Sequence, residues 1–252
     1  MASNAGKKDG SGIGPLIRSD GRMPDECREI KVHADYIQTA LGSCLFEMGN
    51  TRVLCTATTE DSVPPHKRGS GEGWVTAEYS MLPGSGTSRV PRSRSRSGRT
   101  MEIQRLIGRS MRAVVDLSLL GERTLYIDCD VLQADGGTRC ASITGGYLAV
   151  CRAVDTLMKT GGLEKSPLIG SVAAVSVGII GTTPILDLDY GEDVEADVDM
   201  NVVMTGQGRF VEVQGTAEGE PFKKSEMNKM IALAEKGINQ LFEIQARHLD
   251  GS

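Results

Sequence analysis

The chain has 252 residues, 39% of them hydrophobic and 24% charged, with a formal net charge of −5. This composition suits a soluble globular protein with a substantial core. Since no apolar run reaches the roughly 18–20 residues of a membrane span, we expect a cytoplasmic location and no membrane partner. Aromatic residues make up only 4%, which disfavours base-stacking platforms, and the net charge alone argues against a nucleic-acid partner. The charges are separated, however, into an acidic run, DLDYGEDVEADVD, and a basic run, SRVPRSRSRSGR.

The N-terminal half is expected to contain strands and two helices. Residues 1–14 are polar and glycine-rich, which predicts a disordered extension before a single domain over residues 15–248. Apolar residues at three- and four-residue spacing predict a helix over residues 99–117, and a run of small residues predicts a closely packed helix over residues 141–158. Enrichment in Val, Ile, Thr and Cys predicts strands at 30–38, 43–49, 51–59, 73–82 and 124–134.

The C-terminal half repeats this kind of order. Strands are predicted at 168–181 and 184–190, followed by an acidic loop. A hairpin is predicted over residues 200–216, and a helix over residues 224–247. Strand–strand–helix order that occurs twice indicates an α+β or α/β layered domain with internal pseudo-symmetry.

The segment Gly136-Gly137-Thr138-Arg139 lies where a predicted strand gives way to a predicted helix. It lacks both the G-x-x-x-x-G-K-[ST] and the G-x-G-x-x-G frames. Backbone N–H groups freed of side-chain bulk, a hydroxyl and a guanidinium at a helix start are nevertheless suited to an anion such as phosphate. Taken alone, the segment is more simply interpreted as a tight strand-to-helix turn that exposes an arginine.

Asp193 and Asp199 lie in the acidic run, among five further carboxylates: Asp187, Asp189, Glu192, Glu195 and Asp197. Crowded carboxylates must be solvated, protonated or neutralised by a cation. Hard oxygen ligands suit Mg²⁺, which commonly takes one or two carboxylates and completes its shell with substrate phosphate. The spacing alone does not separate such a site from a solvated acidic loop.

The basic run forms a loop between a predicted strand and a predicted helix. Its glycine- and serine-rich composition could allow a grip on a phosphodiester backbone without base reading. A phosphorylated Ser-Arg tail is the poorer interpretation, because the run is short and enclosed by structure. The candidate RNA-binding residues are Arg89, Arg92, Arg94 and Arg96, leading to Arg99 at the helix start.

These segments together resemble the ribonuclease PH family of phosphate-dependent 3′ exoribonucleases, which trim transfer RNA precursors. The resemblance runs in order from about residue 18 to about residue 245. It is carried by SDGRMPDECREI, GNTRVLCTAT, GWVTAEYSMLP, GRTMEIQRLIGRSMRAVVDL, GERTLYIDCDVLQADGGTRCASITGGYLAV, AAVSVGI, DLDYGEDVEADVDMNVVMTGQGRFVEVQGTAEG and LAEKGINQL. The loop after MLP departs from the family pattern: it is shorter, and Gly84 stands where an arginine is frequent.

The resemblance implies a duplicated β-α module and a homohexamer built as a trimer of dimers. It implies that Gly137, Thr138 and Arg139 cradle inorganic phosphate together with Arg99. It implies that Asp193 and Asp199 bind a divalent metal, Mg²⁺, or supply a general acid, so that the catalytic set is Asp193, Asp199, Arg99 and Arg139. The arginines of residues 89–96 would hold the RNA 3′ end.

The expected reaction is phosphorolysis, in which phosphate attacks the last internucleotide phosphorus and releases a nucleoside diphosphate. The reverse reaction would extend RNA. Two other classes are weighed against it. A non-catalytic RNA-binding ring subunit would lack the cradle or the acidic pair, and a hydrolytic metal-dependent nuclease would have no use for an arginine-lined cradle.

Overall fold

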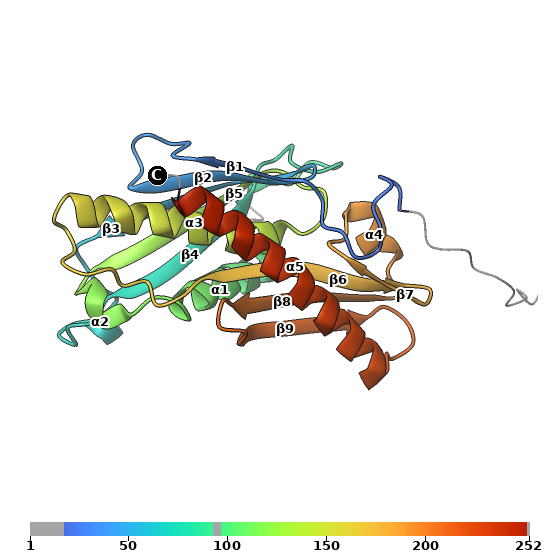
Figure 1. Cartoon of the computed structure of the whole chain (residues 1–252). Helices are drawn as coiled ribbons and strands as arrows, with labels where there is room; N and C mark the ends of the chain where they lie inside the picture. Colours follow the sequence, from blue (N-terminus) through green and yellow to red (C-terminus); the bar gives the residue numbers. More distant parts are fainter. Residues whose placement is uncertain (1–17, 93–96, 251–252) are drawn as a thin grey trace, which may run out of the picture.

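The computed structural model describes residues 18–92 and 97–250 (Figure 1). The predicted extension over residues 1–14, together with Arg94 and Arg96, lies outside the described residues. Among the described residues, no helix combines the length and the apolar character that crossing a membrane would require.

Two sheets form the framework. The first has the order β1-β2-β3-β5-β4 and is antiparallel except for the β4–β5 pair. Its strands are β1 (Ile30–Ala34), β2 (Gly42–Met48), β3 (Thr51–Glu60), β4 (Trp74–Met81) and β5 (Thr124–Gln133). The second sheet has the antiparallel order β7-β6-β8-β9. Its strands are β6 (Val172–Ile180), β7 (Thr183–Leu186), β8 (Val198–Thr205) and β9 (Phe210–Ala217).

The helices cover these sheets. The long helix α3 (Thr138–Lys159) follows β5 and packs on β2, β3 and β6, so that it contacts both sheets. The long helix α5 (Lys224–Asp250) follows β9 and crosses the second sheet, as Figure 1 shows. The helix α1 (Gly98–Arg112) packs on β4, and α2 (Leu117–Leu120) and the 3₁₀ turn η1 (Pro65–Lys67) are short connections. Each half therefore ends in a long helix after its sheet, which confirms the α+β class and the duplicated β-α module.

Close packing of α3 on the first sheet depends on small residues. A Cβ atom at Gly145 would lie 2.7 Å from the Cβ of Phe46 on β2. A Cβ atom at Gly42 on β2 would lie 2.2 Å from the carbonyl oxygen of Ala149. Because real Cβ contacts are never this short, the helix reaches this distance from the sheet only with glycine at both positions. The predicted close-packed helix is confirmed.

Several elements differ from the sequence-based expectations. The strands predicted at 30–38, 168–181 and 184–190 are shorter, as β1 (Ile30–Ala34), β6 (Val172–Ile180) and β7 (Thr183–Leu186). The helix predicted over residues 99–117 ends at Arg112, because Val115 becomes extended and bridges Leu168. The helix expected from residue 141 begins at Thr138, directly after the glycine pair. The expected acidic loop contains a short helix, α4 (Tyr190–Glu195), which begins with a capping box between Asp189 and Glu192.

Candidate active site

A cavity of about 730 Å³ gathers candidate residues that lie far apart in the sequence. Both halves of the chain contribute to its walls. It is lined by Arg92, Arg99, Gly137, Thr138, Arg139, Asp193 and Asp199, each of them a residue that the sequence marked as a candidate. Arg89 is described by the structure but does not line the cavity, and Arg94 and Arg96 lie outside the described residues.

The glycine pair forms the turn between β5 and α3. Gly136 and Gly137 have φ angles of 72° and 66°, in the left-handed region that glycine adopts without strain. A Cβ atom at Gly136 would lie 2.6 Å from the carbonyl oxygen of Leu188, so this residue also lets the turn pack against the second half of the chain. Gly137 is the N-cap residue of α3, and the turn therefore opens directly onto a helix N-terminus.

The hydroxyl of Thr138 at the start of α3 is held by a residue that sequence reasoning missed. Tyr79 on β4 places its Oη atom 2.9 Å from Thr138 Oγ1. Burial raises the pKa of Tyr79, so its phenol keeps its proton at neutral pH. The alternation of GWVTAEYSML places Tyr79 on the inward face of the strand, where a polar tip needs a partner. This inward position is the sequence feature that could have identified Tyr79 as a site residue.

Two arginines of the site come from different elements. Arg139, in the first turn of α3, donates from Nη1 to Gln214 Oε1 at 2.6 Å and to Glu102 Oε1 at 3.2 Å. These contacts orient its guanidinium by means of β9 and α1. Arg99 lies exposed in the first turn of α1, behind the N-cap residue Ser97. Glu102 and Gln214 were not among the candidates, since nothing local in their segments indicates a partner so far along the chain.

The two candidate carboxylates lie on different elements. Asp193 lies on α4, and Asp199 is the second residue of β8, paired with Gly178 and Thr216. Desolvation by the cavity walls raises the pKa of Asp193, and the charges of Arg99 and Arg139 offset part of that rise.

Asp199 is also pushed toward its protonated form. Its pKa is raised first by burial and then by the negative charges of Asp193 and Glu218. Glu218 follows β9, lines the cavity and was missed by sequence reasoning. Repulsion among these three carboxylates favours either a proton or a cation between them.

The acidic side chains of the cavity can supply only part of the coordination shell of a metal ion. Among residues 18–92 and 97–250, no cluster of three or more His, Cys, Asp or Glu side chains is arranged to hold a metal ion. Protein ligands alone therefore do not complete a shell. Two carboxylates completed by water and substrate phosphate match the habits of Mg²⁺, which keeps much of its shell outside the protein. Asp193 and Asp199 fit that role, and their metal binding stays a prediction.

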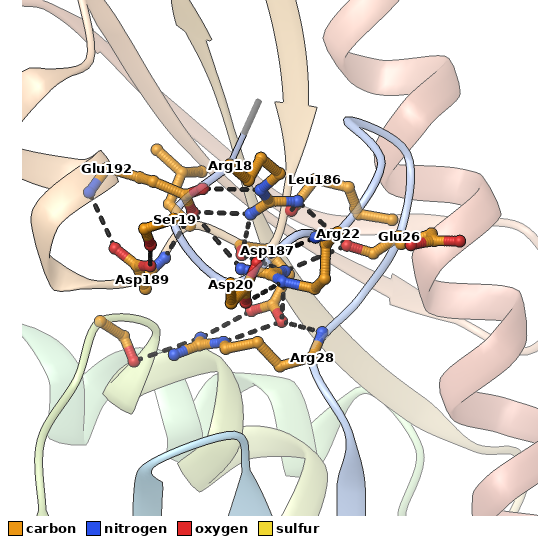
Figure 2. A network of polar contacts seen from close by, with 12 residues as sticks. Arg18, Ser19, Asp20, Arg22, Glu26, Arg28, Leu186, Asp187, Asp189 and Glu192 are labelled. Atoms are coloured by element: carbon orange, nitrogen blue, oxygen red, sulfur yellow. Dashed lines mark hydrogen bonds and ion pairs between the residues drawn. The ribbon is translucent and has the colours of Figure 1, made fainter. Parts of the chain in front are cut away.

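The helix α4, which carries Asp193, is held by the N-terminal segment. Figure 2 shows Arg18 paired with Glu192, with Nε and Nη2 each donating to one carboxylate oxygen at 2.6 Å. Arg18 also donates to the carbonyl oxygens of Leu186 and Asp187, both at 2.8 Å. Both partners of the ion pair are buried, with exposures of 3% for Arg18 and 8% for Glu192.

This pair predicts an acid-sensitive element of stability. Burial tends to raise the pKa of Glu192, but its hydrogen bonds with Arg18 and with the Asp189 N–H outweigh burial and lower this pKa below that of an ordinary glutamate. A lowered pKa contributes stability that is present above about pH 4.5 and is lost as the pH falls through the folded-state pKa. We expect Glu192→Gln to lower the free energy of unfolding at pH 7 by about 3–5 kcal/mol, because it leaves a buried Arg18 unpaired.

Urea unfolding of the native protein and of Glu192→Gln, followed by circular dichroism between pH 7 and pH 3, measures this effect. The difference in the free energy of unfolding between the two should shrink as the pH falls. A difference that stays constant over that range would contradict the assignment.

Comparison with known proteins identifies the family. The model for the 3′ exoribonuclease family, domain 1, matches residues 26–154, and the model for domain 2 of the same family matches residues 170–237. The domain boundaries at residues 15 and 248 stay a prediction.

Solved structures share the fold at low sequence identity. Rice (Oryza sativa) Rrp46 is 15% identical with a TM-score of 0.74, over 92% of this chain and 100% of that chain. An archaeal exosome core is 20% identical with a TM-score of 0.74, over 91% of each chain. The Archaeoglobus fulgidus exosome with RNA bound to the active site is 21% identical with a TM-score of 0.74, over 90% of this chain and 91% of that one. Because the two family models together span most of the chain, the protein belongs to the ribonuclease PH family of 3′ exoribonucleases.

Proposed function

We propose that the protein is a phosphorolytic 3′-to-5′ exoribonuclease that trims the 3′ ends of transfer RNA precursors. One observation carries the proposal: a single cavity joins the glycine turn, Thr138 and two arginines to the carboxylates of Asp193 and Asp199. A hydrolytic nuclease needs the carboxylates alone, and a passive RNA-binding subunit needs neither. A site for phosphate beside two carboxylates is what a phosphorolytic enzyme needs, because its nucleophile is the phosphate anion.

Inorganic phosphate is proposed to bind at the turn. The Thr138 hydroxyl and the guanidinium groups of Arg99 and Arg139 hold its oxygens, together with the backbone N–H groups before α3. A phosphate oxygen then forms a bond to the phosphorus of the last internucleotide linkage, in line with the P–O3′ bond that breaks. Since the nucleophile and the RNA backbone are both negatively charged, neutralisation and positioning by the arginines supply much of the rate enhancement.

The leaving 3′ oxygen needs a proton, and Asp199 is proposed to donate it. Its raised pKa keeps a larger protonated fraction toward neutral pH than an ordinary aspartate has. The products are a nucleoside diphosphate and an RNA one nucleotide shorter with a 3′ hydroxyl. The same residues serve the reverse reaction, in which Asp199 takes the proton from the 3′ hydroxyl and a nucleoside diphosphate extends the RNA.

Mg²⁺ is the proposed cofactor. When bound by Asp193 and Asp199, it would neutralise charge on the phosphate groups. The side-chain types and the mutual repulsion of the carboxylates support this role.

RNA is the proposed macromolecular partner. The solved Archaeoglobus fulgidus exosome carries RNA in its active site, on the same fold. In this chain Arg92 lines the cavity. We propose that Arg92, together with Arg89, Arg94 and Arg96, contacts the backbone of an entering strand. A homohexamer built as a trimer of dimers and a cytoplasmic location complete the proposal.

The dependence on phosphate tests the function. The full chain is incubated with 3′-labelled RNA and Mg²⁺, with and without inorganic phosphate, and the products are separated by chromatography. We expect nucleoside diphosphate only when phosphate is present. Nucleoside monophosphate in phosphate-free buffer would indicate hydrolysis, and RNA binding with no product in either buffer would indicate a non-catalytic subunit.

A further inference from the structure

A buried hydroxyl binds the turn that forms the proposed phosphate site. Thr51 lies at the start of β3 and is fully buried. Its Oγ1 accepts from the Asp135 N–H at 2.9 Å and donates to the Gly136 carbonyl oxygen at 2.6 Å. One side chain therefore binds both ends of a two-residue stretch that contains the first glycine.

Arg28, which lies just before β1, also binds this stretch, and its own anchor comes from the other half of the chain. Its guanidinium donates to the carbonyl oxygen of Asp135 through Nη1 and to that of Gly136 through Nη2, at 3.5 Å for the latter. Nε and Nη2 also donate to the two carboxylate oxygens of Asp187, at 3.0 and 2.7 Å (Figure 2). Arg28 is only 5% exposed and Asp187 is fully buried, so solvent screens this bridge little.

Asp187 is itself firmly placed. Its φ angle is 53°, a left-handed conformation that few residues other than glycine adopt. The backbone N–H of Arg28 donates to its Oδ2 at 2.8 Å, and its own N–H donates to the carbonyl oxygen of Ser176 at 2.7 Å. Asp187, which anchors Arg28, is therefore fixed through both its own main chain and its own side chain.

The direction of these contacts determines where the N–H groups of the turn point. In a trans peptide, the C=O and the following N–H point in opposite directions. The carbonyl groups of Asp135 and Gly136 are turned toward Arg28 and Thr51, so the N–H groups of Gly136 and Gly137 point the other way. Within the described part of the chain, neither of these two N–H groups donates to a protein acceptor, and both residues line the cavity.

We propose that Arg28 and Thr51 are positioning residues that lock the turn in its phosphate-binding conformation, with Asp187 as the anchor of Arg28. This rests on the proposed phosphate site. Two consecutive glycines are free to adopt many conformations, so the rigidity of the turn must come from its surroundings. Donors that are already oriented need no reorganisation when the anion arrives. Neither residue lines the cavity.

The test replaces Thr51 by valine, which keeps the shape of the side chain and removes both hydrogen bonds. In steady-state phosphorolysis by the full chain, we expect KM for inorganic phosphate to rise about tenfold, with KM for RNA unchanged. Thr51→Ser keeps the hydroxyl and should restore the native KM. The matched control is Thr156→Val at the far end of α3, which removes a hydroxyl bonded to the Leu41 carbonyl oxygen and should leave both KM values unchanged.

Arg28→Lys provides the second variant, because lysine keeps a charge beside Asp187 but cannot also span two carbonyl groups. Thermal stabilisation by added inorganic phosphate, measured on the native protein and each variant, separates the two levels of inference. A native protein that phosphate neither stabilises nor activates would overturn the proposed function. A native protein that responds, with Thr51→Val and Arg28→Lys responding equally, would overturn the positioning role alone. The positioning role is supported if phosphate stabilises Thr51→Val and Arg28→Lys less than the native protein and stabilises Thr51→Ser as much.

Discussion

Asp199→Asn is expected to lower kcat by about 10²–10⁴-fold, which is the range that a general acid contributes. Asparagine keeps the size of the side chain and its place on β8 but cannot release a proton to the leaving 3′ oxygen. Burial and the charges of Asp193 and Glu218 raise the pKa of Asp199. Since the protonated form acts, the native kcat should fall as the pH rises through that raised pKa, and the variant should lack this fall.

The measurement is kcat for phosphorolysis across pH at saturating phosphate and RNA. Asp197→Asn is the matched control, since Asp197 is an exposed carboxylate two residues away that accepts from the Gly181 N–H at 2.7 Å, as an asparagine oxygen also can. The control should keep the native kcat. If raising Mg²⁺ restored kcat in Asp199→Asn, the residue would act as a metal ligand alone and the general-acid assignment would be wrong.

Most helices and strands of the fold were predicted from local sequence patterns. The glycine turn before α3, the hairpin of β8 and β9 and the two long helices depend on neighbouring residues, and each was predicted in kind. The acidic run was expected to be a loop because of its charge, but a capping box starts a helix within it. Asp189 followed three residues later by Glu192 is a helix-start pattern. This pattern predicts a helix that includes Asp193.

The supporting residues of the site could not be found in the same way. Arg28 meets Asp187 across 159 positions, and Arg139 meets Gln214 across 75. Nothing in either local segment encodes such a pairing, because it arises from how the two sheets pack around α3. Sequence motifs therefore indicated the groups that face the cavity, whereas the contacts that orient those groups required the tertiary structure.

Arg139→Ala is expected to raise KM for inorganic phosphate sharply and to reduce kcat/KM by about 10²–10³-fold, the effect of losing one oriented charged donor at a reacting anion. Its guanidinium is fixed by Gln214 and Glu102 before phosphate arrives. Arg139→Lys should recover little, since lysine keeps the charge but cannot pair with both partners and present a planar fork to phosphate. Affinity for RNA, measured by fluorescence anisotropy in phosphate-free buffer, should stay close to native.

The matched control is Arg109→Lys, since Arg109 lies on α1, half exposed, and its ion pair with Glu212 at 2.8 Å belongs to a class that contributes little. It should change neither KM. The two readouts for Arg139 separate the possible roles, because a residue that binds phosphate affects KM for phosphate and a residue that grips the strand affects RNA affinity. A collapse of RNA affinity in Arg139→Ala with an unchanged KM for phosphate would move Arg139 from the phosphate site to the RNA path. The anion site would then depend on Arg99, Thr138 and the turn that Arg28 and Thr51 hold in place.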